Sequence, residues 1–366
     1  MKVGGVHHRT IEPAEDGRAV AVIDQTRLPW AFAWKRLEGV DDAAAAIRDM
    51  VVRGAPLIGA TAAYGMALAA RASADDTLLE RAGERLRNAR PTAVNLAWAV
   101  DRVLGVLEPF DASERPAAAW REARAIADAD AALNKAIGEA GLGVLRRAYE
   151  GKADDGPVNV LTHCNAGWLA TVDWGTALAP VYMAHEAGLP VHVWVDETRP
   201  RNQGASLTAW ELANHGVPHT VVADNAGGHL MQQGRVDLCL VGTDRVAANG
   251  DVANKIGTYL KALAARANGV PFHVALPGPT FDPALPDGGH IPIEERDGAE
   301  VHSITGADAD GTARTVRLVP EGSPVANPGF DVTPAHLVSG FITENGVGAA
   351  SAAGLAALFD DAAAAS

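Results

Sequence analysis

Hydrophobic positions in the second half of the chain come in short runs, and longer segments with helical spacing separate them. Five such runs stand at 158–162, 191–195, 219–223, 237–241 and 272–276. The segments between them that favour a helix cover 175–187, 206–214, 228–233 and 252–267. Strands that alternate with helices are typical of βαβ units, which form a parallel sheet with right-handed crossovers. The pattern predicts a Rossmann-like parallel-sheet α/β domain over residues 151–350.

The first part of the chain has a different pattern, in which most apolar residues recur at helical spacing. Helices are expected over 43–52, 56–71, 76–89, 92–107 and 113–145. A pair of strands is expected within 19–37, around the stretch "AVAVIDQTRLPWAFAWKRL". We therefore expect an α/β protein in which a mainly helical domain with a small β element, residues 1–150, precedes the sheet domain. Residues 351–366 form an Ala-rich C-terminal tail.

The composition is that of a globular protein with ample core material. Of its 366 residues, 48% are hydrophobic and 21% are charged. The net charge of -14 opposes unspecific binding to nucleic acid or to an anionic membrane, although a local basic pocket can still bind a small anion. The two cysteines form no disulfide framework, and the first residues lack the apolar core of a signal peptide. We expect a cytoplasmic protein that binds neither nucleic acid nor membrane.

Polar residues follow every one of the five predicted strands. These connections begin with the stretches 163–167, 196–204, 224–225, 242–245 and 277–280. In open α/β sheets, ligands bind beyond the carboxyl ends of the strands. One polar loop is ordinary turn chemistry, but several at the same edge of a sheet indicate an active site.

Cys164 and Asp244 are the candidate catalytic residues. Cys164 stands at a strand end beside an expected helix start, where the helix dipole favours a thiolate; the alternative is a small buried residue. His163 is its neighbour in an extended segment and so points to the opposite face, which argues against a simple Cys–His pair. Cys239 lies within a predicted strand and is expected in the core.

Asp244 directly follows a predicted strand, and two roles are open to it. It could cap the next helix, but Asp251 lies nearer to the helix expected to begin at Val252 and fits a cap better. That leaves Asp244 for acid–base chemistry. An aspartic acid that donates a proton near pH 7 needs a raised pKa, which burial against apolar walls provides.

Asn254 and Lys255 fall in the first turn of that expected helix. A lysine there is disfavoured by the helix dipole, and a bound anion resolves the conflict; the alternative is a solvated lysine. Arg53 and Arg90 each stand shortly before a proline at an expected helix start. Both arginines could face one anion, although each alone is typical of a surface residue.

Several long stretches resemble the methylthioribose-1-phosphate isomerases of the methionine salvage pathway. They include "VVRGAPLIGATAAYGMAL", "RPTAVNLAWAVDRV", "LTHCNAGWLATVDWGTAL", "DETRPRNQGASLTAWEL" and "GTDRVAANGDVANKIGTY". The superfamily also contains ribose-1,5-bisphosphate isomerases and regulatory subunits of the eukaryotic nucleotide-exchange initiation factor. The chain departs from the expected pattern at Leu57 and Pro279, where small or small polar residues are usual.

The resemblance implies an aldose–ketose isomerase that acts on a sugar 1-phosphate without cofactor or metal, as a homodimer. Asp244 would be the acid–base residue at the ring oxygen and the C2 hydroxyl, and Cys164 would be a base or a stabiliser of the transition state. The residues implied to hold the sugar phosphate are Arg53, Gly54, Ala55, Arg90, Gln203, Asn254 and Lys255. A strand-linked GxGxxG motif for a dinucleotide is absent.

Three alternatives remain open at the level of sequence. The first is an isomerase of another pentose 1-phosphate, such as ribose 1,5-bisphosphate or 5-deoxyribose 1-phosphate. The second is a non-catalytic regulatory subunit of the same fold that senses a sugar phosphate, and the presence of both Cys164 and Asp244 argues against it. The third is a thiol acyl transferase or hydrolase that uses Cys164, for which no histidine base is identified.

Overall fold

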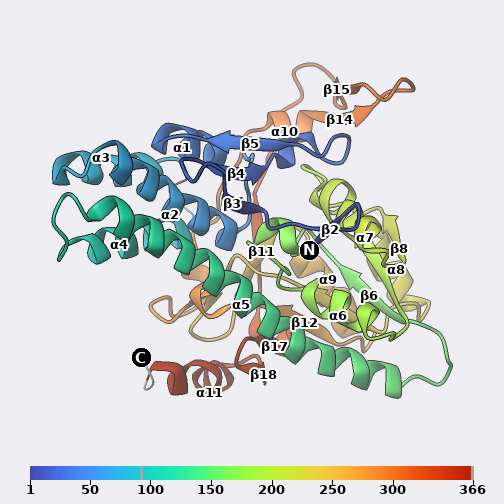
Figure 1. Cartoon of the computed structure of the whole chain (residues 1–366). Helices are drawn as coiled ribbons and strands as arrows, with labels where there is room; N and C mark the ends of the chain where they lie inside the picture. The colour runs from blue at the N-terminus through green and yellow to red at the C-terminus, as the bar shows by residue number, and fades with distance from the viewer. Residues whose placement is uncertain (91–93, 364–366) are drawn as a thin grey trace. The chain divides into compact units, whose positions relative to one another are not determined.

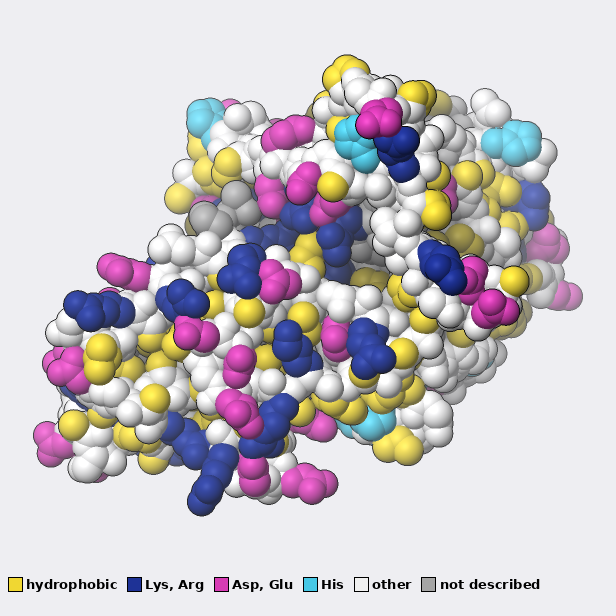
Figure 2. All heavy atoms as spheres, turned by 90° about the horizontal axis from the view of Figure 1, so that it is seen from above, with side chains coloured by type: hydrophobic (Ala, Val, Ile, Leu, Met, Phe, Trp, Pro, Cys, Tyr) yellow, Lys and Arg dark blue, Asp and Glu magenta, His cyan; other side chains and the backbone are white. Residues whose placement is uncertain are grey.

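The computed structural model describes residues 1–90 and 94–363. Figure 1 traces the chain. It divides into two compact units, the first made of Met1–Lys135 and Trp168–Gly175, the second of Ala136–Gly167 and Thr176–Ser366. No helix among the described residues is long and apolar enough to cross a membrane. Exposed acidic and basic side chains are interspersed on the face drawn in Figure 2.

The first unit is mainly helical, as expected. It contains a small antiparallel sheet in the order β3-β4-β5, which confirms the strands expected within 19–37. Its strands are β1 (Lys2–Val3), β2 (Val6–His7), β3 (Ile11–Pro13), β4 (Val20–Ile23) and β5 (Trp34–Leu37). Its helices are α1 (Val40–Arg48), α2 (Ala55–Ala72), α3 (Asp76–Arg87), α4 (Val94–Leu107) and the first part of α5 (Arg115–Glu150). The start of the expected 92–107 helix lies outside the described residues.

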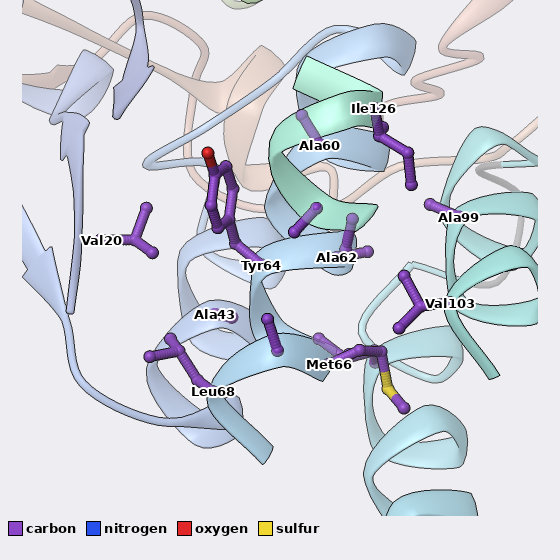
Figure 3. Close-up of a cluster of buried hydrophobic side chains, with 14 of the residues drawn as sticks. Val20, Ala43, Ala60, Ala62, Tyr64, Met66, Leu68, Ala99, Val103 and Ile126 are labelled. Atoms are coloured by element: carbon purple, nitrogen blue, oxygen red, sulfur yellow. The ribbon is translucent and has the colours of Figure 1, made fainter. Parts of the chain in front are cut away.

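Helix α2 forms the centre of this unit because it is apolar on all sides. Its side chains from Leu57 to Ala70 are buried, as a helix without a polar face requires. Tyr64 and Met66 pack among residues of neighbouring helices such as Val103 (Figure 3). Small residues let those helices come close: a Cβ on Gly59 would lie 3.1 Å from the carbonyl oxygen of Asn95. The first turns of α2 and α4 therefore lie side by side.

The second unit contains a seven-stranded sheet in the order β18-β17-β12-β9-β6-β7-β8, which confirms the Rossmann-like prediction. The six strands from β17 to β8 are parallel, and β18 is an antiparallel edge. The strands are β6 (Val158–Thr162), β7 (Val191–Asp196), β8 (His219–Val222), β9 (Leu238–Val241), β12 (Phe272–Ala275), β17 (Gly340–Thr343) and β18 (Gly346–Gly348). All five apolar runs found in the sequence form strands of this sheet.

Helices connect these strands. They are α6 (Ala179–Glu186), the π-helical turn η3 (Gly204–Thr208) continued by α7 (Ala209–His215), α8 (Ala226–Gln232) and α9 (Thr258–Ala267). The later chain adds α10 (Ala299–His302), the hairpin β14 (Ser303–Ala307) and β15 (Ala313–Arg317), and α11 (Ala352–Ala363) in the Ala-rich tail.

The prediction of a single helix over 252–267 is wrong at its start. Val252–Lys255 is strand β11 of a second, four-stranded sheet in the order β13-β10-β11-β16. Its other strands are β10 (Arg245–Ala247), β13 (Phe281–Asp282) and β16 (Phe330–Thr333). An Asn-Gly turn at 249–250 joins β10 to β11, and Gly250 has a φ of 92°, as hairpin turns of this kind require. Pairing with the distant strand β16 decides the conformation.

The expected role of Asp251 as a helix cap changes with this correction. Asp251 does not cap a helix: its carboxylate accepts hydrogen bonds from the backbone of Gly288, at 3.1 Å, and Ala335, at 2.9 Å. Helix α9 is capped instead by Asp331 of β16, which accepts from the N–H groups of Gly257 and Tyr259 at 2.7 and 3.1 Å. The cap is thus supplied by a strand far away in the sequence.

Candidate active site

Cys164 lies in the connection after β6 and is held by two threonines. Its φ is 66°, an uncommon backbone conformation for a residue with a side chain. The Cys164 N–H donates to Thr198 Oγ1 at 2.8 Å, and Thr208 Oγ1 donates to the Cys164 carbonyl oxygen at 2.8 Å. These bonds compensate for the backbone strain. They keep the half-buried Cys164 thiol in one place.

The helix expected to start beside Cys164 is absent. Residues Trp168–Ala170 form a short 3₁₀ turn, η2, and the next α-helix begins only at Ala179. A helix dipole therefore does not explain thiolate character at Cys164. Cys239, by contrast, is fully buried in β9 as expected, and burial raises the pKa of its thiol well above the ordinary range.

A buried polar network that sequence reasoning missed fixes the stretch after Cys164. The Asn165 amide donates to Glu211 Oε1 at 2.9 Å, and the Tyr182 hydroxyl donates to Glu211 Oε2 at 2.6 Å. Burial and the Glu211 carboxylate raise the pKa of Tyr182 well above its usual value. A Cβ on Gly167 would come within 1.8 Å of Glu211 Oε2, so only glycine fits there. The stretch Cys-Asn-Ala-Gly at 164–167 was the only sign of this network in the sequence, because it places an amide and a glycine directly after Cys164.

Among the described residues, one group of three side chains in the second unit has the spacing of a metal site. His163, Asp196 and Asp224 place one ligand atom each within 4.8 Å of the others. Lys261 Nζ, however, already lies 3.2 Å from Asp196 Oδ2. An ammonium group in this position supplies the positive charge that a metal would bring, so the residues present fit an ion-pair network better than a metal centre.

Asp244 follows β9, the strand that pairs directly with β6. Its N–H donates to the carbonyl oxygen of Ala253 at 3.0 Å, and Thr243 Oγ1 donates to the same oxygen at 2.7 Å. Asp244 is therefore anchored to β11, the strand that carries Asn254 and Lys255. The neighbouring Arg245 has its own partner, since its guanidinium lies 2.6 Å from Asp282 Oδ2.

Asn254, Lys255 and Gln203 are all buried, with exposed fractions of 5%, 7% and 4%. Asn254 and Lys255 lie on β11 and not in a helical turn, so the prediction of their position is wrong. The alternative of a solvated lysine is also wrong, because a buried lysine needs partners. Lys255 Nζ lies 5.1 Å from the centre of the Phe330 ring, and the Lys255 carbonyl accepts from Thr258 Oγ1 at 2.7 Å.

The remaining predicted residues belong to the first unit. Gly54 precedes α2 with a φ of 89°, and a Cβ there would lie 2.2 Å from the carbonyl oxygen of Ala170. Ala55 begins the helix. Arg53 is buried, which contradicts the surface alternative, and Arg90 is half-buried shortly before α4. Because the first turns of α2 and α4 are adjacent, the two arginines precede neighbouring helix starts.

Comparison with known proteins decides the family. The model of the initiation factor 2 subunit family matches residues 51–350. The methylthioribose-1-phosphate isomerase of Methylorubrum extorquens is 64% identical, with 99% of this chain and 99% of that protein covered. That of Rhodospirillum centenum is 63% identical, with coverages of 99% and 96%. The chain belongs to the methylthioribose-1-phosphate isomerase family.

Solved structures agree with membership of the methylthioribose-1-phosphate isomerase family. The 5-methylthioribose 1-phosphate isomerase of Pyrococcus horikoshii OT3 is 41% identical and superposes with a TM-score of 0.85 over 97% of this chain and 96% of its own. A structure described as translation initiation factor eIF-2B, subunit delta, from A. fulgidus is 37% identical, with a TM-score of 0.81 and coverages of 97% and 100%. Both the fold and the family predicted from the sequence are confirmed.

The two departures from the pattern of the methylthioribose-1-phosphate isomerase family occupy different surroundings. Leu57 is fully buried in the helical core of the first unit. Pro279 lies in the short turn η4 (Gly278–Thr280) of the second unit, where Gly278 N–H donates to Glu344 Oε1 at 3.0 Å. Burial raises the pKa of Glu344 despite that bond. Neither substitution interrupts an element of the fold.

Proposed function

We propose that this chain converts 5-methylthio-D-ribose 1-phosphate, an aldose, into 5-methylthio-D-ribulose 1-phosphate, a ketose, as a step of methionine salvage. The identity of 64% to a methylthioribose-1-phosphate isomerase over nearly the whole of both chains carries the proposal. The geometry of the second unit supports it. Cys164 and Asp244 follow the carboxyl ends of two adjacent parallel strands, β6 and β9, where α/β proteins bind their ligands.

The chemistry of the substrate explains why an acid–base pair is needed. Phosphate on C1 prevents the ring from opening by simple mutarotation, so a proton must reach the ring oxygen while the phosphate stays attached. The C2 hydroxyl then loses its proton, the hydrogen on C2 moves to C1, and C2 becomes the ketone. No atom or electron is gained or lost. We assign proton transfer at the ring oxygen and the C2 hydroxyl to Asp244.

Cys164 is proposed to act beside Asp244, as a base or as a stabiliser of the transition state. The hydrogen can travel from C2 to C1 as a proton through an enediolate or directly as a hydride. Substrate deuterated at C2 distinguishes these routes, because a hydride keeps its deuterium in the product and an enediolate exchanges it with water. Retention would leave Cys164 as a stabiliser, and exchange would favour it as the base.

Binding of the sugar phosphate is assigned to buried cations, amides and helix starts. In the second unit these are Gln203, Asn254 and Lys255; in the first unit they are Arg53, Gly54, Ala55 and Arg90. Burial of Lys255 and Arg53 supports this, since a buried cation attracts a phosphate more strongly than a solvated one does. Backbone N–H groups at the start of α2 suit a phosphate. No metal or cofactor is part of the proposal.

Incubation with a panel of pentose 1-phosphates, followed by NMR detection of the ketose, tests the function. We expect the 5-methylthio substrate to be converted with the highest kcat/KM. Faster conversion of ribose 1,5-bisphosphate or 5-deoxyribose 1-phosphate would reassign the substrate. Binding without conversion of any of the sugars would point to a regulatory subunit instead.

We also propose that the protein is a homodimer located in the cytoplasm. The family resemblance supports both statements. Light scattering at micromolar concentration is expected to give twice the mass of 37.9 kDa. Cell fractionation is expected to recover the protein with cytoplasmic markers. A monomeric mass, or recovery with the membrane, would contradict the respective statement.

A further inference from the structure

His163 lies directly before Cys164, is 1% exposed, and has an acceptor at each ring nitrogen. Its Nδ1 lies 2.9 Å from Asp196 Oδ2, and its Nε2 lies 2.8 Å from the carbonyl oxygen of Ile256. A carbonyl oxygen only accepts hydrogen bonds. The Nε2 atom of His163 therefore carries a hydrogen.

The other ring nitrogen, Nδ1, is held by the carboxyl group of Asp196. Asp196 is fully buried, and Lys261 Nζ lies 3.2 Å from the same Oδ2 atom that faces His163. An ammonium group only donates hydrogen bonds, so this oxygen accepts from Lys261. His163 Nδ1 and Lys261 Nζ therefore share one oxygen of a buried side chain.

Further charged groups lie around the ring. Asp224 Oδ1 lies 3.9 Å from His163 Nδ1 and accepts from the N–H of Thr198 at 2.7 Å. Lys261 Nζ donates to the Asp224 carbonyl oxygen at 2.5 Å. Asp331, whose pKa burial raises, is a further acid near His163 and Lys261. Asp196, Asp224 and Lys261 thus surround the Nδ1 side of the ring.

The second hydrogen bond of His163 reaches the turn that follows Lys255. Ile256 directly follows Lys255, and the next residue, Gly257, has a φ of 103°. A Cβ at Gly257 would lie 3.1 Å from His163 Nε2, so the backbone of the turn packs directly against the ring. One side chain thereby connects the strand end at Cys164 with the segment that carries Lys255.

We propose that His163 is a positioning residue for the isomerisation: its buried ring ties the Cys164 connection to the turn after Lys255. Its bond to Asp196 orients the ring, and its bond to the Ile256 carbonyl holds the turn. The proposal rests on the proposed function only as far as Lys255 binds the sugar phosphate. Its claim about the ring is independent of any substrate.

Two substitutions separate the two bonds of the ring. In His163→Asn the side-chain amide reaches the place of Nδ1, so it can keep the hydrogen bond to Asp196 but loses the hydrogen bond to the Ile256 carbonyl oxygen. In His163→Gln the amide reaches the place of Nε2 and can keep Ile256. Loss of the hydrogen bond leaves the Ile256 carbonyl without its ring partner, which should raise KM about tenfold to hundredfold in His163→Asn, and clearly less in His163→Gln. Equal KM values for both variants, or wild-type KM in His163→Asn, would overturn the positioning role.

NMR of protein labelled with ¹⁵N-histidine tests the bond to Ile256 without substrate. The ring signals of His163, assigned by their absence in His163→Gln, are expected to include an Nε2 hydrogen that exchanges slowly with water, because the ring is buried and Nε2 donates to the Ile256 carbonyl oxygen. His192 is partly exposed and serves as the internal reference, since its ring hydrogen should exchange faster. Equally fast exchange at both rings would overturn the proposal.

Added Zn²⁺ tests the metal alternative in the same samples. If His163 is bound to Asp196 and to the Ile256 carbonyl oxygen, its ring signals should not move when Zn²⁺ is added to protein treated with a chelator. A shift of the ring signals with stoichiometric Zn²⁺ would overturn the proposal in favour of a metal site. Failure of the isomerase assay would leave these ring measurements unaffected, so the two hypotheses fail separately.

Discussion

The connections after β6 and after β9 leave the same edge of the sheet from adjacent strands, yet they are built in different ways. The first, at 163–167, forms no sheet of its own and is held by side chains from other connections, such as Thr198 and Thr208. The second, at 242–257, folds into two strands of a separate sheet. Asp244 and Lys255 are therefore positioned mainly by backbone pairing.

This difference predicts how each connection responds to substitution. Where side chains hold the backbone, removal of one hydroxyl or ring leaves a buried polar group without its bond. Where strand pairing holds it, most single side chains of the connection can change without loss of position. Matched variants should then show two kinds of effect. Removal of a catalytic side chain should lower kcat, and removal of a side chain that holds the first connection should lower the free energy of unfolding.

The largest effect is expected from Asp244→Asn, which removes the acid–base group and leaves the backbone bond to Ala253 intact. Its kcat should fall about 10²- to 10⁴-fold. Asp251→Asn is the matched control in the same connection, because Asp251 binds the backbone of Gly288 and Ala335. We expect its kcat to stay near that of the wild type. Steady-state kinetics of both variants would contradict the assignment if Asp251→Asn lost more activity than Asp244→Asn.

For the first connection, Cys164→Ser should lower kcat about 100-fold, within the usual range for an acid–base group or a stabiliser of the transition state.

In the wild type, iodoacetamide should modify Cys164, which is half-buried, and spare Cys239, which is fully buried and has a raised pKa. Peptide mass spectrometry after limited labelling measures this selectivity. Modification of Cys239 at an equal rate would show that the reactivity assigned to the first connection is wrong.

Thr198→Val tests the claim that side chains hold the Cys164 backbone. The variant leaves the Cys164 N–H without its acceptor, and the free energy of unfolding should fall by about 1–3 kcal/mol. Thr220→Val is the control, since Thr220 is exposed and its hydroxyl bonds only the partly exposed His192 in the described structure. Urea unfolding measures both. Equal stabilities of the two variants would mean that the bond at Cys164 contributes little.

The smallest effect concerns Asp331, which caps α9, the helix that follows the second connection in the chain. Burial raises its pKa, so the folded protein holds the proton more tightly than the unfolded chain does. The wild type therefore loses stability as the pH rises from the ordinary carboxyl range, about 3.9, through the pKa of the folded state. Asp331→Asn does not titrate, so the stability of the wild type relative to this variant should decline over that window. Urea unfolding at several pH values measures this difference. A stability of the wild type relative to Asp331→Asn that stayed constant or grew with rising pH would contradict the raised pKa of Asp331.

Much of the sheet and of its active edge could be predicted from the sequence. Five strands could be predicted from apolar runs, because the length of a run and its flanking turn residues are visible in the local sequence. They are β6, β7, β8, β9 and β12. Cys164 and Asp244 could be chosen because each directly follows such a strand. The roles proposed for them, and for Arg53, Gly54, Ala55, Arg90, Gln203, Asn254 and Lys255, stay predictions.

What the sequence could not show was which partner each polar group finds. The segment 252–255 has apolar residues that suit a helix as well as a strand, and its pairing with β16 settled the matter. Glu211 gave no sign of its bonds to Asn165 and Tyr182, since these residues meet only in the folded chain.

The sequence by itself determined the alternation of strands and helices, the family, and the edge of the sheet at which chemistry is expected, because these depend on local spacing and on motifs. Only the tertiary structure decided that β11 is a strand, that Asp331 caps α9, and that His163 faces two acceptors. Each of these rests on hydrogen bonds between residues far apart in sequence, such as Asp331 and Gly257. Local patterns contain no information about such partners.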